Sequence, residues 1–192
     1  GTLSSDARCK VPSRYEAMHG KNLKKTIQKE FRVGQKDLST ALQLLAVDPV
    51  ECECDVVAMA CKGIGTNELL LLTVLCGRSN KEIGLLKKKY FDVYEDDLGR
   101  VLDAELSGDL QKIVFYLIQG AEEEYDEDYH TEALMEQDAE KLFEMGQGNW
   151  FGTDESGLFK MLCTRPGEYI KKLDEVYESK HGRGLSKVLK RE

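Results

Sequence analysis

One pattern occurs twice in this sequence with the same spacing, and it limits the fold more than any other feature does. Counted from Gly65 or from Gly152, the same residue types recur at seven positions over the next 40 residues. After Gly65 they are Thr66, Glu68, Cys76, Arg78, Tyr90, Leu98 and Glu105, and after Gly152 they are Thr153, Glu155, Cys163, Arg165, Tyr177, Leu185 and Glu192. Near the start, Tyr15, Leu23 and Glu30 keep the spacing of the last three positions. Self-similarity of this kind indicates an array of copies of one supersecondary unit.

The three copies differ in how much of the unit they contain. We predict a partial first copy over residues 7–47, a complete second copy over 53–119 and a partial third copy over 136–192. Residues 120–135 separate the second and third copies and begin with a strongly acidic run. A run of like charge is typical of a solvated linker or helix end. We therefore expect an incomplete array with an exposed acidic linker before its last copy.

Helical periodicity dominates the chain, and no stretch alternates apolar and polar residues as a strand does. The expected helices cover residues 7–19, 22–32, 36–47, 54–60, 67–76, 81–94, 95–106 and 109–119, the last five of which make up the complete copy. Pro12 weakens the first helix, and Asp48-Pro49 is expected to break the chain. Residues 69–76 are apolar all round, which predicts that this helix is the most buried. The predicted fold class is all-α.

Two glycines, Gly63 and Gly65, separate the first and second helices of the complete copy. Glycine adopts positive φ readily, so a turn here can direct main-chain carbonyl oxygens outward. Thr66 is a suitable N-cap for the next helix, and Glu68 suits the first turn of that helix. Carbonyl oxygens combined with a carboxylate such as that of Glu105 suit a hard cation like Ca²⁺. A plain helix-turn-helix without a ligand is the alternative for the turn taken alone.

Composition narrows the class of partner. The chain has 192 residues, of which 41% are hydrophobic, and a net charge of −8, which is typical of a globular and acidic protein. This acidity argues against nucleic acid as a partner and against direct attachment to an anionic lipid surface. The longest apolar run, residues 69–76, is far shorter than a membrane span, and no signal-peptide pattern opens the sequence.

The six cysteines are scattered, and two of them, Cys76 and Cys163, occupy equivalent positions of the pattern in apolar surroundings. This distribution predicts buried, reduced thiols in a cytoplasmic protein and not a disulfide framework. Cys52 and Cys54 form a C-x-C pair, for which a metal or redox role is the alternative. No second pair and no nearby histidine complete a zinc set, so we expect the pair to be structural.

The turn Lys62-Gly63-Ile64-Gly65-Thr66, with an acidic residue 40 positions after its second glycine, resembles the repeat of the annexin family. The stretch from Asp138-Ala139-Glu140 to Trp150-Phe151-Gly152-Thr153-Asp154-Glu155 resembles the third annexin repeat, and the acidic spacer before it is similar to the link between repeats two and three. The resemblance covers nearly the whole chain. It implies a right-handed superhelix of five-helix repeats that docks on acidic phospholipid membranes when calcium is present, as a cytoplasmic protein peripheral on membranes. An annexin core has four repeats, of which this chain supplies about two and a half.

Carried over position by position, the resemblance implies two calcium sites. The first would use the main-chain oxygens of Cys61, Gly63 and Gly65 with both carboxylate oxygens of Glu105. The second would use the main-chain oxygens of Gly146, Trp150 and Gly152 with Glu192. The residues expected at the membrane are Lys62, Ile64, Trp150 and Phe151, since an indole suits the headgroup level. The alternatives are a Trp150 packed beneath its loop and a Lys62 that is only solvated.

Catalysis is not expected. No nucleophile stands at motif spacing from a base, and no phosphate-binding loop is present. Arg78 and Arg165 are expected to bond helix-end carbonyls. Two other functions stay open: an annexin-fold scaffold that binds cytoskeletal or other proteins without calcium, which Glu30 without a turn of its own would suit, and self-association through uncovered apolar faces.

Overall fold

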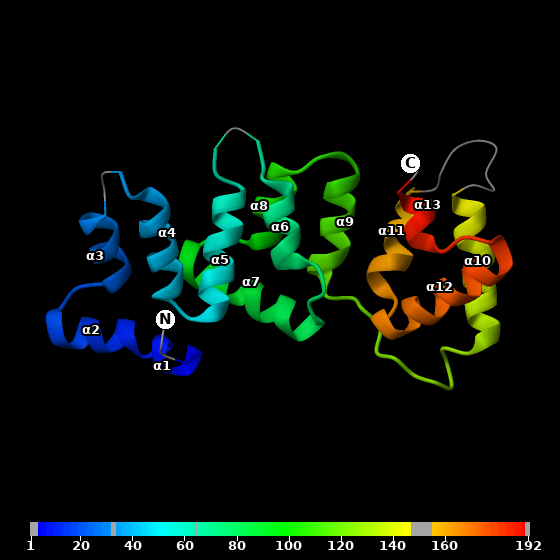
Figure 1. Cartoon of the computed structure of the whole chain (residues 1–192), viewed down its shortest axis with the longest axis horizontal. Coiled ribbons are helices and arrows are strands. Elements are labelled where there is room, and N and C mark those ends of the chain that lie inside the picture. Colours follow the sequence, from blue (N-terminus) through cyan, green and yellow to red (C-terminus); the bar gives the residue numbers. More distant parts are fainter. Residues whose placement is uncertain (1–3, 32–33, 64, 147–154, 191–192) are drawn as a thin grey trace. The chain divides into compact units, whose positions relative to one another are not determined.

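The computed structural model describes residues 4–31, 34–63, 65–146 and 155–190, and every regular element within them is an α-helix (Figure 1). This confirms the all-α fold class. The chain divides into two compact units, Gly1–Cys76 with Gly84–Val101, and Gly77–Ile83 with Leu102–Glu192. The division falls within two helices, α7 (Asn80–Tyr94) and α8 (Leu98–Glu105). Among the described helices, none has both the length and the apolar character that a bilayer span requires.

The first copy contains one more helix than predicted. Its helices are α1 (Ser5–Cys9), α2 (Val11–His19), α3 (Leu23–Glu30) and α4 (Lys36–Leu45). The predicted helix over 7–19 is divided at Lys10, and Pro12 lies in the first turn of α2. A proline is tolerated there because its missing N–H has no partner within the helix anyway. Pro12 therefore helps to begin a helix instead of weakening one.

The complete copy contains the five predicted helices: α5 (Pro49–Ala60), α6 (Glu68–Leu75), α7, α8 and α9 (Gly108–Gln119). α5 begins at Pro49 and not at residue 54, because the Asp48 side chain accepts the Glu51 N–H at 3.0 Å and caps the helix. The Asp48-Pro49 pair therefore starts a helix where a break was predicted. α8 begins at Leu98, later than predicted, because Asp97 caps it by accepting the Arg100 N–H at 2.9 Å.

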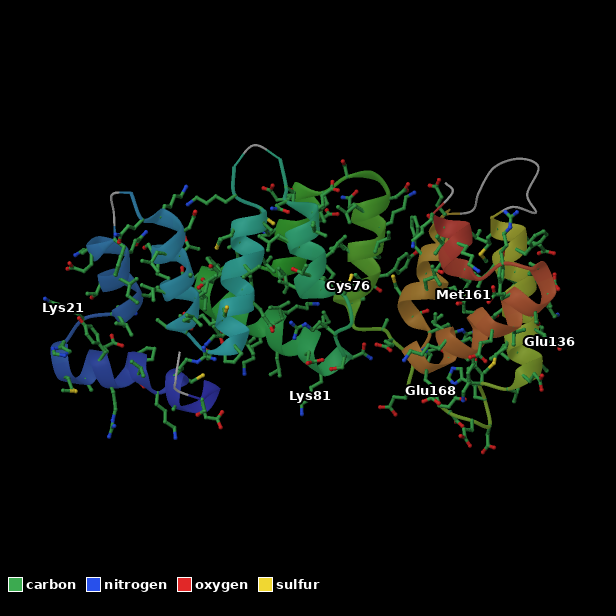
Figure 2. All side chains as sticks on the ribbon, viewed as in Figure 1. Lys21, Cys76, Lys81, Glu136, Met161 and Glu168 are labelled. Atoms are coloured by element: carbon green, nitrogen blue, oxygen red, sulfur yellow. The ribbon has the colours of Figure 1, made fainter. Side chains whose placement is uncertain are left out.

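α6 is buried on one face only, although its residues are apolar all round. It packs against α5, and its Leu71 and Leu75 side chains are buried. On the opposite side of the same helix, Leu69 is 76% exposed. Cys76, which follows α6, is exposed as well (Figure 2), although the sequence predicts a buried thiol. Only one face of this apolar helix is covered, so uniform hydrophobicity did not translate into uniform burial.

The third copy contains α10 (Glu132–Met145), α11 (Glu155–Thr164), α12 (Gly167–His181) and α13 (Leu185–Leu189). α10 begins within the stretch predicted as a linker, because Thr131 caps it by accepting the Leu134 N–H at 3.3 Å. α10 packs against α12, and α11 packs against α9. The four helices of the third copy, α10 to α13, share a core made of Met135, Ala139, Leu142, Leu158, Tyr169, Leu173, Tyr177, Leu185 and Val188.

The acidic segment before α10 is anchored to this core. The Glu123 N–H donates to the Thr164 carbonyl at 2.7 Å, and His130 is only 3% exposed. Arg165 binds the Glu123 carboxylate at 2.7 Å and the fully buried Asp138 carboxylate at 2.9 Å. Arg165 thus bonds carboxylates, where helix-end carbonyls were predicted. Although most carboxylates of the segment are exposed, an ion-pair network holds it to the third copy.

Candidate functional site

The turn between α5 and α6 carries the geometry that the two glycines predict (Figure 1). Gly63 has φ of 119° and Gly65 has φ of 82°, and both residues are exposed. An added Cβ at either position would meet no other atom within 4 Å, so space is not what requires glycine there. The positive φ angles require it, because other residues adopt them only with strain. The positive φ expected at both glycines is confirmed.

Two backbone hydrogen bonds close the base of this turn. The Asn67 N–H donates to the Ala60 carbonyl at 2.8 Å, and the Lys62 N–H donates to the Met59 carbonyl at 3.3 Å. The last residue of α5 is thereby tied to the residue that precedes α6. The ends of the turn are fixed by this pairing, and the side chain of Lys62 is exposed.

The N-cap of α6 is Asn67 and not the predicted Thr66. The Asn67 side-chain oxygen accepts the Leu70 N–H at 3.1 Å. Asparagine is at least as good an N-cap as threonine, so both neighbours satisfy the same sequence rule. As a result α6 begins at Glu68, one residue later than the prediction placed it.

The predicted carboxylate ligand, Glu105, is the last residue of α8 and is exposed. Glu30 ends α3 in the same way and is also exposed, so the two acidic positions of the pattern are structurally equivalent. Glu105 and the Gly63–Gly65 turn belong to different compact units. Their joint action on one cation therefore stays a prediction.

Most of the second predicted site lies outside the described residues. Of its members, only Gly146 is described: it follows α10, and its N–H donates to the Leu142 carbonyl at 3.1 Å. Trp150, Phe151, Gly152 and Glu192 are outside the described ranges, as is Ile64 of the first turn. Their predicted roles at a calcium ion or at a membrane remain predictions.

Metal ligation by clustered side chains finds no support in the described part of the chain. No group of three or more His, Cys, Asp or Glu residues there is arranged to hold a metal ion. No disulfide joins any of the six cysteines, all of which lie within the described ranges.

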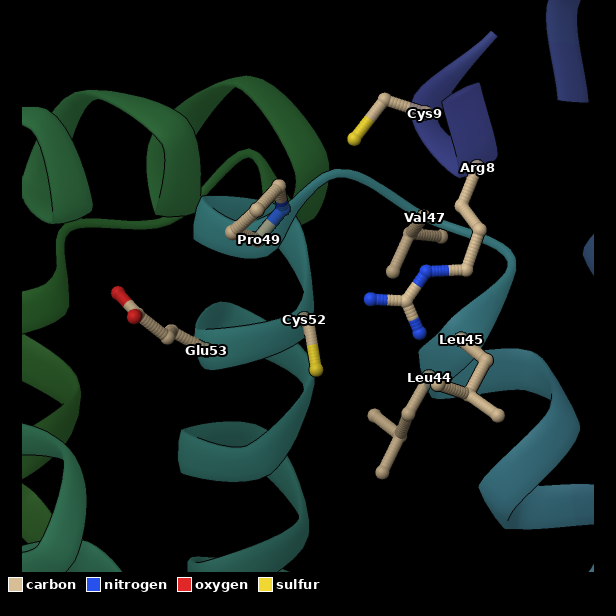
Figure 3. A pocket seen from close by; sticks show the side chains of 8 residues that line it. All are labelled: Arg8, Cys9, Leu44, Leu45, Val47, Pro49, Cys52 and Glu53. Carbon is tan, nitrogen blue, oxygen red and sulfur yellow. The ribbon is translucent and has the colours of Figure 1, made fainter. Parts of the chain in front are cut away.

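The two thiols of the C-x-C pair point to different surroundings. Cys52 lines a cavity of about 330 Å³ near the Arg8 guanidinium (Figure 3). Cys54 is buried, and its Sγ donates to the Leu86 carbonyl at 3.7 Å. Burial, with a smaller contribution from the Asp55 charge, raises the pKa of the Cys54 thiol to about 12. Because the thiolate is the metal ligand, the raised pKa of Cys54 disfavours a metal role for this pair.

One residue beside the turn escaped the sequence analysis. Leu69 belongs to the run predicted to be buried, yet it is among the most exposed large apolar residues described. A helical wheel separates Leu69 from Leu71 and Leu75 by more than 100°, so periodicity alone could have placed it on another face. What periodicity cannot show is that this face lacks a cover.

A family model described as Annexin matches residues 53–117, within the complete copy. Annexin C1 of Cryptococcus neoformans is 34% identical over 91% of this chain. Annexin A13 of Canis lupus familiaris is 32% identical over 91% of this chain. The chain belongs to the annexin family.

The annexin fold is equally clear from solved structures. The structure of annexin III matches with a TM-score of 0.87 at 27% identity, and the match covers 98% of this chain and 57% of that chain. The chain spans 36% of annexin C1 and 54% of annexin A13, about half or less of these relatives. The likeness establishes the family and the all-α annexin fold.

Proposed function

We propose that this annexin chain binds acidic phospholipid membranes in a calcium-dependent manner through the Gly63–Gly65 turn. The observation that carries the proposal is the exposed turn itself, with positive φ at both glycines and with its two ends tied together. The main-chain oxygens of Cys61, Gly63 and Gly65 are its proposed ligands. Both carboxylate oxygens of Glu105 complete the set. Membership of the annexin family, for which calcium-dependent phospholipid binding is typical, supports this assignment.

Counting ligands explains why a membrane is needed. The proposed set supplies five oxygens, whereas Ca²⁺ takes six to eight. One or more positions therefore remain for water or for a lipid phosphate. A single carboxylate faces a doubly charged ion, so we expect calcium affinity without lipid to be weak, with a Kd of about 10⁻⁴ M or higher. A phosphate oxygen adds both the missing ligand and the missing charge.

The charge of the chain fits this bridging role. With a net charge of −8, the chain and an acidic lipid surface repel each other. A cation held between them converts this repulsion into attraction. The chain would thus be peripheral on membranes, and calcium would decide when it is bound.

A second bridging site is proposed in the third copy. Its ligands would be the main-chain oxygens of Gly146, Trp150 and Gly152 with the carboxylate of Glu192. Trp150 and Phe151 would contact the headgroup region there, as Lys62 and Ile64 would at the first turn. Two weak sites on one chain would raise the affinity for a surface well above that of either site.

Co-sedimentation with vesicles of phosphatidylserine and phosphatidylcholine tests the proposal. We expect the chain to pellet with vesicles in calcium and to stay in solution in excess chelator. Glu105→Gln should raise the calcium concentration required by about tenfold or more, because it removes the only formal charge of the first site. Glu30→Gln is the matched control: Glu30 is also an exposed last residue of a helix, and it is not among the proposed ligands of the first site.

Two results would count against the proposal. Equal pelleting in calcium and in chelator would remove the bridging cation and favour the calcium-independent scaffold. Equal calcium requirements of the Glu105→Gln and Glu30→Gln variants would exclude Glu105 as a ligand. Isothermal titration of the Glu105→Gln variant with calcium, in the absence of vesicles, would then show whether the turn binds the ion without the Glu105 carboxylate.

A further inference from the structure

Leu69 stands out among the apolar residues of the first unit. Its side chain is 76% exposed, although it belongs to a helix whose Leu71, Val74 and Leu75 side chains are buried against the rest of that unit. Leaving a leucine in water costs free energy that burial would recover. A single exposed leucine is common on protein surfaces and needs no explanation. The position of this one, beside the proposed calcium turn, is what gives it meaning.

The boundaries of α5 and α6 place Leu69 beside the turn. Leu69 lies in the first turn of α6, four residues after Gly65. Met59 lies in the last turn of α5 and is 42% exposed. Because α5 packs against α6 and the base of the turn is closed by hydrogen bonds, both side chains lie within one helical turn of that base. The exposed Lys62 belongs to the same turn.

Leu85, another exposed apolar residue of this unit, does not share that location. Leu85 is 48% exposed and lies on α7, one turn before Lys89. Lys89 binds the Asp48 carboxylate at 2.7 Å, and Asp48 caps the end of α5 that is remote from the turn. In Figure 1 the turn and α7 accordingly appear at opposite ends of α5. Leu85 therefore provides a matched comparison of similar chemistry.

We propose that Leu69, assisted by Met59, enters the acyl-chain boundary of the bilayer once calcium has brought the turn to the lipid headgroups. This inference rests on the function proposed above and adds an apolar component to it. The partner is an acidic phospholipid bilayer, because such a surface offers hydrocarbon for the two apolar side chains and negative charge for Lys62 within a few ångströms of depth. Methionine adapts its shape to irregular apolar surroundings, which suits a fluid boundary.

The apolar contact makes a prediction that calcium ligation alone does not make. Leu69→Gln should lower the affinity for phosphatidylserine and phosphatidylcholine vesicles in saturating calcium by about tenfold, since full burial of a leucine side chain corresponds to about 10- to 100-fold. Leu85→Gln should leave that affinity unchanged. The calcium affinity measured without vesicles should be the same for both variants and the parent chain, because neither change touches a proposed ligand.

A second variant, Leu69→Trp, reports how deeply residue 69 lies in the bilayer. In Leu69→Trp, the added indole should show blue-shifted emission on vesicles in calcium, and phosphatidylcholine brominated on its acyl chains should quench it. The parent chain, whose one tryptophan is Trp150, supplies the background to subtract. Circular dichroism of each variant, which should match that of the parent chain, checks that a loss of binding does not come from a loss of helices.

The outcomes separate this inference from the proposed function. Weaker vesicle binding by Leu69→Gln alone, together with quenching of Leu69→Trp, supports it. Equal affinity of both glutamine variants, with binding still dependent on calcium, overturns the apolar contact and leaves the calcium bridge intact. Absence of calcium-dependent binding by the parent chain overturns both. Sedimentation showing that the parent chain self-associates and that Leu69→Gln does not would assign the residue to a second copy of the chain and overturn the inference.

Discussion

At the scale of single residues, the backbone of Glu95 carries local strain. Its φ is 56°, and it is the only residue other than glycine with positive φ in the described part of the chain. It follows the last residue of α7, a position where glycine is preferred. We expect Glu95→Gly to raise the free energy of unfolding by about 0.5–1 kcal/mol, because relief of strain outweighs the added freedom of the unfolded chain. Urea denaturation followed by circular dichroism measures it.

Glu175→Gly is the control for that change. Glu175 is exposed within α12, and its replacement removes the same charge from a helical backbone. This variant should lose about 1 kcal/mol, so the two substitutions should act with opposite signs. Destabilisation by both would show that Glu95 is not strained. Residue type predicted positive φ at Gly63 and Gly65, because glycine adopts it readily. The positive φ of Glu95 was not predictable, because glutamate rarely adopts it.

At the scale of elements, the first residue of a helix depends on which of several suitable neighbours acts as its N-cap. Thr66 and Asn67 are adjacent and both suit an N-cap, and only the structure shows which one accepts the hydrogen bond. Asp48-Pro49 fits a break as well as a start, and it is a start because the Asp48 side chain is available to cap α5. The existence of each helix in the complete copy was therefore predictable from periodicity, but its first residue was not.

The acidic segment before α10 is held by contacts that its sequence does not reveal. A run of carboxylates looks solvated in the sequence, yet Arg165 ties Glu123 to the buried Asp138. Arg165→Met should lower the free energy of unfolding by about 3 kcal/mol, because it leaves a buried carboxylate without its strongest cationic partner. It should also speed cleavage of this segment by a glutamate-specific protease, since Glu124 and Glu127 are exposed.

Arg183→Met provides the comparison for that experiment. Arg183 is exposed between α12 and α13, and its loss should change the stability by no more than about 0.5 kcal/mol. Protease resistance of the segment should be unaffected. If Arg165→Met and Arg183→Met behaved alike, the network around Asp138 would contribute nothing measurable, and the segment would be the free linker that its charge suggests.

At the scale of the whole molecule, the repeated spacing was the most informative property of the sequence. Matching residues after Gly65 and Gly152 identified the copies, and helical periodicity predicted the five helices that the structure contains in the complete copy. Spacing reports which positions are equivalent because every copy must bury the same face. It cannot report which faces another element covers, so the exposure of Leu69 and Cys76 was not predictable from it. The positive φ angles of the turn were predictable from its two glycines, whereas calcium binding there together with Glu105 stays a prediction.

The net charge of the whole chain determines how salt should affect its binding to vesicles. A chain with a charge of −8 should not bind acidic vesicles in chelator at any ionic strength, because lowering the salt strengthens the repulsion. In calcium, binding should persist when sodium chloride is raised from about 0.05 M to about 0.3 M, since coordination and apolar contact are screened less than long-range attraction is. Co-sedimentation at both salt concentrations measures this, with vesicles of phosphatidylcholine alone as the control that should not bind. Calcium-free binding that grows as salt is lowered would instead reveal a basic face that acts without a bridging ion, and the calcium turn would lose its role in attachment.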